Sequence, residues 1–168
     1  CGLDFAAVDM EHAGLTLREV EGHIRAGRAS GMPVIVRVPD SDAGNISRVL
    51  DAGAEGVIVP HVTSAADVSR IRATTRYAPA GSRPTCTGVR SNRFGLGNLA
   101  EGALEANDRA LFVGLIEDAE AFEDLDALAA SDIDVLFPGP SDLASSFGFP
   151  GQLQHPLVEA ALDRLMVA

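Results

Sequence analysis

The sequence predicts an α/β fold built on a parallel sheet, and two features indicate it. Five short apolar runs alternate with longer amphipathic segments along the 168 residues, which is the order that strand–helix–strand units produce. The strand-like runs are apolar throughout, as expected of parallel strands covered on both faces. The pattern alone leaves open a doubly wound sheet and a (β/α)₈ barrel, and a complete barrel needs about 250 residues.

The first half of the chain is expected to hold three strand–helix pairs. Residues 34–38 are β-branched apart from Arg37 and follow Pro33, which is typical of a strand. Thr63 or Ser64 can cap the third helix. The predicted strands are residues 3–8, 34–38 and 56–62, and the predicted helices are residues 16–30, 44–52 and 64–76.

The second half begins with a long loop. Residues 77–97 carry Gly, Pro, Ser, Thr and Arg without apolar periodicity, and loops of this length usually have a function. No repeat or linker divides the chain, so residues 1–168 are predicted to form a single domain. The later elements are expected as a helix at 98–107, a strand at 111–116, a helix at 119–131, a strand at 134–137, and helices at 142–147 and 155–167.

Composition excludes several classes of partner. The net charge of −11 and the pI of about 4.6 argue against nucleic acid and anionic membranes, because both need a basic face. No apolar run approaches the length of a membrane span. Neither a G-x-G-x-x-G after the first strand nor a P-loop lysine motif occurs, so nothing supports a nucleotide site. The two cysteines have neither metal-site spacing nor a disulfide framework, and a reducing cytoplasm is the expected compartment.

Polar side chains stand at the ends of the predicted strands. Because the carboxyl ends of parallel strands meet at one edge of a sheet, we expect these side chains to converge there. Carboxylates suit a hard cation, histidine suits acid–base chemistry, and arginine suits an anionic substrate. In chain order they are Asp9, Glu11 and His12 after the first strand, Arg37 in the second, His61 after the third, Glu117 after the fourth and Asp142 after the fifth.

Each of these residues also has a plainer interpretation. Glu117 and Asp142 would each stabilise the start of a helix through the macrodipole. His12 and His61 would be loop or structural residues, and Arg37 would pair with a surface carboxylate. Asp51 stands near the end of a predicted helix, where the macrodipole disfavours an acid, so a specific partner is expected for it.

A series of short motifs resembles one known family in order. The sequences VDMEHA, PVIVRVP, RVLDAGA, VPHV, RYAPAGSR, IE and GPSDL occur at residues 8–13, 33–39, 48–54, 59–62, 76–83, 116–117 and 139–143. They resemble the hydroxy-ketoacid aldolase/citrate lyase β-subunit superfamily in its 4-hydroxy-2-oxo-acid aldolase branch. The resemblance extends over nearly the whole chain.

The resemblance implies a (β/α)₈ TIM barrel that uses Mg²⁺ or Mn²⁺ and acts on a small 2-oxo acid, as a homo-oligomer. The chain would supply about strands two to six of that barrel and be truncated at both ends. Asp9, Glu11 and His61 are further candidates for the site. The implied roles are metal binding by Glu117 and Asp142, substrate binding by Arg37 and by the backbone of Gly139, Pro140 and Ser141, and acid–base catalysis by His12 oriented by Asp51.

Two departures from the family pattern concern the substrate. Leu115 stands where many aldolases of this branch have Gln, two residues before the metal-binding Glu. Residues 87–95 look more like the loop of relatives that make citrate for siderophores, and Arg90 or Arg93 would then meet a more highly charged substrate, unless the loop is simply solvated. The predicted activity is metal-dependent carbon–carbon cleavage or formation through a pyruvate-like enolate. A citrate synthase-like condensation and a non-catalytic partial barrel are the alternatives.

Overall fold

The computed structural model describes residues 2–168 as an α/β fold with one parallel sheet. Its strands are β1 (Ala6–Asp9), β2 (Val34–Arg37), β3 (Gly56–Val59), β4 (Leu111–Ile116) and β5 (Val135–Pro138). The strands are hydrogen-bonded in chain order, and all neighbouring pairs are parallel. A doubly wound sheet reverses its strand order at a switch point, whereas a barrel does not. The sheet is therefore the consecutive part of a (β/α) barrel, as predicted.

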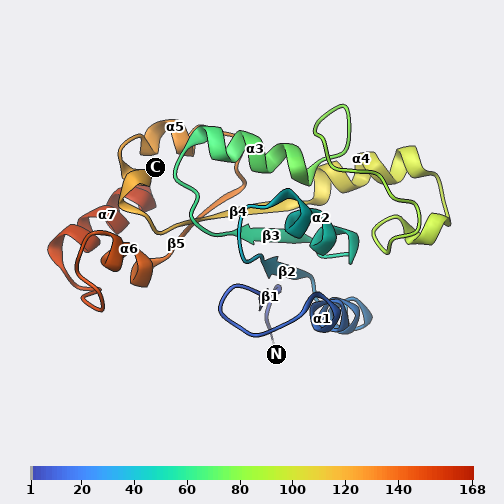
Figure 1. Ribbon diagram of the computed structural model, residues 1–168, viewed down its shortest axis with the longest axis horizontal. Helices are drawn as coiled ribbons and strands as arrows, with labels where there is room; N and C mark the ends of the chain where they lie inside the picture. The colour runs from blue at the N-terminus through green and yellow to red at the C-terminus, as the bar shows by residue number, and fades with distance from the viewer. Residues whose placement is uncertain (1) are drawn as a thin grey trace.

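The helices fall close to their predicted positions. In Figure 1 the chain passes from β1 to β5, with α1 beside β1 and β2, and with α6 and α7 beyond β5. Among the described residues, no helix is long and apolar enough to cross a membrane. The helices are α1 (Leu17–Ser30), α2 (Ala43–Asp51), α3 (Ala65–Thr75), η1 (Arg93–Gly95), α4 (Leu99–Arg109), η2 (Ala119–Phe122), α5 (Leu125–Ala129), α6 (Pro140–Ser146) and α7 (Pro156–Val167).

One predicted helix is wrong in detail. Residues 119–131 form the 3₁₀ turn η2 and the short helix α5 instead of one continuous helix. Asp124, between them, has φ −138° and ψ 53°, which lies outside the helical region and interrupts the hydrogen-bond ladder.

Side-chain caps fix where the first three helices begin. Thr16 and Glu19 form a capping box at α1, in which the Thr16 amide and hydroxyl both donate to Glu19 Oε2. Asp42 Oδ1 accepts from the Gly44 amide at the start of α2. Ser64 Oγ accepts from the Asp67 amide at the start of α3, as the sequence predicted. Each helix starts after a strand ends, so it runs back across the sheet from the carboxyl edge to the amino edge.

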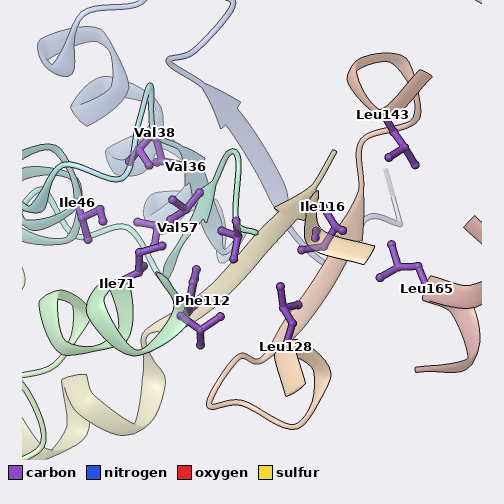
Figure 2. Packing of buried hydrophobic residues seen from close by; sticks show 14 of the residues in the cluster. Val36, Val38, Ile46, Val57, Ile71, Phe112, Ile116, Leu128, Leu143 and Leu165 are labelled. Atoms are coloured by element: carbon purple, nitrogen blue, oxygen red, sulfur yellow. The ribbon is translucent and has the colours of Figure 1, made fainter. Parts of the chain in front are cut away.

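Alternate residues of the strands face two different environments. Val36, Val57 and Phe112 are fully buried, and Figure 2 shows them gathered with Ile46 and Ile71 of the covering helices. The other face carries a separate, smaller cluster of Ile35, Ile58, Val113 and Leu115. Side chains alternate between the two faces along a strand. The helices pack on the first face, so this second face is the inner face of the barrel-like sheet.

Candidate metal and substrate site

The inner face of the sheet turns polar at the carboxyl edge. Arg37 is two residues beyond Ile35, and Glu117 is two residues beyond Leu115, so both continue the inner apolar cluster. Asp9 is paired with Arg37 in the register of β1 and β2. The residues that gather here are named the carboxyl-edge cluster, and they are Asp9, Glu11, Arg37, His61, Glu117, Asp118 and Asp142.

Arg37 is held by two carboxylates. Its Nε donates to Asp9 Oδ1 at 2.8 Å and its Nη2 to Asp9 Oδ2, which is the bidentate geometry that guanidinium and carboxylate prefer. Its Nη1 lies 3.3 Å from Glu11 Oε2. The Glu11 amide in turn donates to Asp9 Oδ1. This arrangement places the guanidinium at the carboxyl edge, near Glu117, and the hydrogen bonds from Arg37 lower the pKa of Asp9 to about 2.

Acidification should remove the stability that Asp9 contributes. Its folded pKa of about 2 lies below the ordinary value of 3.8, so the contribution is complete above the ordinary value and is lost as the pH falls toward the folded one. The free-energy cost of Asp9→Asn, measured by denaturant unfolding, should therefore shrink between about pH 4 and pH 2. Asp163→Asn, at an exposed carboxylate of α7, is the control. A cost of Asp9→Asn that does not change with pH would contradict this role.

Glu117 is the most buried carboxylate of the cluster, with 2% of its surface exposed. Its Oε1 accepts from the His61 amide at 3.1 Å. Burial raises the pKa of Glu117, and the charges of Asp142 and Glu11 raise it further, against the hydrogen bond and charge of His61. A side chain at Gly139 would place its Cβ only 2.6 Å from Glu117 Oε2, so glycine makes room for this carboxylate. Glu117 is therefore an ionisable group kept buried beside other acids, which is unfavourable without a compensating cation.

His61 stands directly opposite Glu117 at the end of β3. Its Nδ1 lies 2.9 Å from Asp118 Oδ2 and 3.5 Å from Glu117 Oε1. Burial lowers the pKa of His61, but the hydrogen bond and charge of Asp118 outweigh it, so the pKa is raised. The ring is 59% exposed and is thus open to solvent at the carboxyl edge.

Three of these residues could hold one metal ion. Glu11, His61 and Glu117 each offer a ligand atom within 4.8 Å of the other two. Glu11 Oε2 is buried and has no hydrogen-bond partner among the described residues, so the oxygen has unused acceptor capacity. Asp142 lies in the first turn of α6, close enough for its charge to act on Glu117, but it is not in this group of three. Carboxylate oxygens with an imidazole nitrogen fit a divalent cation.

His12 and Asp51, which were predicted to pair, have different partners within this chain. Asp51 is the last residue of α2, which crosses from the carboxyl edge to the amino edge. There its carboxylate accepts from Arg83 Nη2 at 2.7 Å. His12 stays at the carboxyl edge, 63% exposed, with its Nε2 3.9 Å from Glu11 Oε2. The specific partner that the sequence indicated for Asp51 is therefore an arginine of the long loop.

Arg90 and Arg93 are also not brought to the carboxyl edge. Arg90 Nη2 donates to Glu21 of α1 at 3.0 Å, and its Cδ lies beside Gly53, just after the end of α2. Arg93 pairs with Glu105 of α4 at 3.5 Å and is exposed. The loop that carries them packs toward the amino edge of the sheet, so these arginines do not line the carboxyl-edge cluster of this chain.

Two residues that shape the carboxyl-edge cluster do so in ways that the sequence did not predict. Asp118 follows Glu117 and holds the His61 ring. The backbone of Gly139 was predicted to bind substrate, but the absence of a side chain at Gly139 also makes room for the Glu117 carboxylate. The signal for Asp118 was the pair of adjacent acids after β4. The close approach at Gly139 depends on two loops whose paths the sequence pattern does not reveal.

The sequence and the fold of this chain are both similar to those of known proteins. The family model described as HpcH/HpaI aldolase/citrate lyase matches residues 1–168. A hydroxypyruvate/pyruvate aldolase of Sagittula stellata is 35% identical over 163 residues, covering 96% of this chain and 64% of the relative. The solved HpcH/HpaI aldolase from Desulfitobacterium hafniense DCB-2 has a TM-score of 0.89 at 34% identity, over 98% of this chain and 63% of that one.

A third similar structure is that of the citrate synthase SbnG, with a TM-score of 0.86 and 31% identity over 98% of this chain and 63% of that one. The chain thus spans a little under two thirds of the length of these relatives. The matches follow the whole described fold, and the family model agrees with the resemblance that the motifs indicated. The chain belongs to the HpcH/HpaI aldolase/citrate lyase family.

Proposed function

We propose that this chain carries the metal- and oxo-acid-binding part of a divalent-metal-dependent carbon–carbon lyase that cleaves or forms 4-hydroxy-2-oxo acids. The observation that carries the proposal is the buried Glu117 carboxylate, which lies among other acids and opposite His61 at the carboxyl edge. Family membership and the aldolase names of several relatives support it. The expected setting is a cytoplasmic homo-oligomer.

Glu117 and Asp142 are the proposed protein carboxylates for Mg²⁺ or Mn²⁺. They follow β4 and β5, in which Ile116 and Pro138 are register partners, so both stand at the carboxyl edge, and the charge of Asp142 helps to raise the pKa of Glu117. A bound divalent ion would act as a Lewis acid on the 2-oxo group of a chelating substrate. Burial of Glu117 keeps water away from one side of this site and strengthens its electrostatic interactions.

Arg37 is proposed to hold the carboxylate or the developing negative charge of the substrate. Its Nε and Nη2 are bound to Asp9, which fixes the plane of the guanidinium. Nη1 points to Glu11 at 3.3 Å without such a bidentate contact, so it is the group best placed to donate to a bound anion. The backbone of Gly139, Pro140 and Ser141 at the start of α6 stays a predicted second contact for the substrate carboxylate.

His12 is the proposed acid–base group. In cleavage, the proton of the C4 hydroxyl passes to a base, the C3–C4 bond breaks, the aldehyde leaves, and C3 then takes up a proton. The exposed imidazole of His12 stands next to Glu11 at the carboxyl edge, where it can exchange protons with substrate or solvent. Within this chain Glu11, and not Asp51, is the carboxylate beside it.

The citrate synthase-like reaction is the second candidate, and it rests on the similarity to SbnG. For that reaction Arg90 and Arg93 were predicted to contact a more highly charged substrate. Both arginines instead pair with glutamates of α1 and α4, away from the carboxyl-edge cluster. The lyase reaction on a smaller 2-oxo acid is therefore preferred.

Removal of the metal should abolish the lyase reaction. Pyruvate released from a set of 4-hydroxy-2-oxo acids would be followed before and after chelation, and after addition of Mg²⁺ or Mn²⁺. We expect activity to disappear with chelator and to return with metal. Activity that persists in excess chelator would refute metal dependence. Thiol release from acetyl-coenzyme A with oxaloacetate, but no pyruvate release, would instead favour the citrate-forming reaction.

A further inference from the structure

His61 has an unusual backbone conformation that is tied to the metal-site carboxylate. Its φ is 55°, in the left-handed region that residues other than glycine seldom adopt. In this conformation its amide donates to Glu117 Oε1 at 3.1 Å while its ring Nδ1 lies 3.5 Å from the same oxygen. Backbone and side chain of one residue thus face a single buried carboxylate.

We propose that His61 is a nitrogen ligand of the divalent metal centre, together with Glu117 and Glu11, and that it makes the centre prefer transition-metal ions over Mg²⁺. The inference rests on the proposed metal-dependent function and adds to its carboxylate oxygens a nitrogen ligand from His61 and a further carboxylate from Glu11. It assigns to the imidazole a direct bond to the ion, whereas the sequence indicated only carboxylates for that role.

The distances suit such a site. Two ligands in neighbouring positions at about 2.1 Å from an ion lie about 3.0 Å apart, and opposite ligands lie about 4.2 Å apart. The 3.5 Å between His61 Nδ1 and Glu117 Oε1 falls between these values. All three residues offer atoms within 4.8 Å of one another. Small side-chain rotations would therefore bring the three ligand atoms around one ion.

An independent observation comes from Glu11. Its Oε2 is buried without a hydrogen-bond partner among the described residues, and its side chain is only 12% exposed. Arg37 Nη1 is 3.3 Å away, but the guanidinium directs two of its groups at Asp9. A buried carboxylate oxygen without a donor is unfavourable. A cation between Glu11 and Glu117 would satisfy this oxygen.

Asp118 holds the His61 ring at this site in the metal-free protein. Its Oδ2 lies 2.9 Å from His61 Nδ1, so an ion bound to this nitrogen would take the place of that contact and would lie beside one more carboxylate. Imidazole nitrogen strengthens binding of ions such as Co²⁺ and Ni²⁺, whereas Mg²⁺ prefers oxygen ligands and retained waters. The preference for transition metals follows from this donor set.

The test uses the intact protein loaded with Mn²⁺ and examined by pulsed electron paramagnetic resonance. We expect a ¹⁴N coupling from a directly bound imidazole in the wild type, and its loss in His61→Asn. Asparagine tolerates a positive φ, so the backbone at this position is retained. His23→Asn, at an exposed histidine of α1, is the matched control and should keep the coupling.

Calorimetric titration gives a second readout that does not depend on activity. His61→Asn should weaken Co²⁺ binding by about 10–100-fold and change Mg²⁺ binding by less than about threefold. Circular dichroism would verify that the variant is folded. If the wild type binds metal without a ¹⁴N coupling, or if His61→Asn keeps it, the inference is overturned while the carboxylate centre stands. If the wild type binds no divalent ion, the proposed function fails as well.

Discussion

Replacement of Glu117 by Gln should abolish divalent-metal binding and reduce lyase turnover by about 10³-fold or more, because it removes the anionic ligand and the charge stabilisation that depends on it. The substitution keeps the volume of the side chain and an oxygen that can accept from the His61 amide. Burial and neighbouring acids disfavour the charged carboxylate in the metal-free protein. The melting temperature should therefore stay the same or rise while metal binding, measured by calorimetry, is lost.

Glu120→Gln is the matched control for this experiment. Glu120 is exposed in η2, three residues further along the chain, and carries the same charge. It should bind metal and turn over substrate as the wild type does. Near-normal metal affinity in Glu117→Gln would show that the ion, if bound, uses other ligands, and would remove Glu117 from the centre.

Replacement of Arg37 by Lys should keep the fold but lower the lyase rate by about 10²–10³-fold, as loss of an oriented charge-stabilising donor usually does. Lysine retains the positive charge but cannot reproduce the fork that binds Asp9 through Nε and Nη2 and leaves Nη1 for a second anion. The ion pair is partly exposed, so its loss should cost only about 1 kcal/mol of stability. Melting temperature and retro-aldol rate would be measured on the same sample.

The control for Arg37→Lys is Arg70→Lys. Arg70 pairs with Asp67 at 3.1 Å on the surface of α3 and does not belong to the carboxyl-edge cluster. It should change neither rate nor melting temperature appreciably. If Arg37→Lys lowers the melting temperature strongly and the folded fraction keeps its full specific activity, Arg37 is a structural partner of Asp9 and not a substrate-binding group.

The polar residues at the strand ends could be predicted because their positions follow from the alternation of side chains along each strand. Alternation along a strand places Arg37 with Ile35 and Glu117 with Leu115, and parallel pairing brings their ends to one edge. The same rule explains why Asp9 meets Arg37, since the two are partners in the β1–β2 register. The polar positions of the candidate site therefore depend mainly on the positions of the strands, which the apolar runs reveal.

The contacts of Asp51 and Arg90 could not be predicted in this way. A helix after a parallel strand ends at the opposite edge of the sheet, so Asp51 is carried away from His12 by the length of α2. Its partner Arg83 and the arginine Arg90 lie in a loop without apolar periodicity. The path of such a loop depends on individual side-chain contacts, which the sequence pattern does not determine.

The excess of acids in the carboxyl-edge cluster should make the binding of the metal ion and the binding of the 2-oxo acid depend on each other. Five carboxylates face one arginine and one histidine there, so a 2-oxo acid that arrives alone meets repulsion, whereas a dication is attracted. Metal should therefore enter first and raise the affinity for the acid. Thermodynamic linkage then requires the bound acid to tighten the metal by the same factor. The same acids that select the ion would retain it for as long as substrate is present.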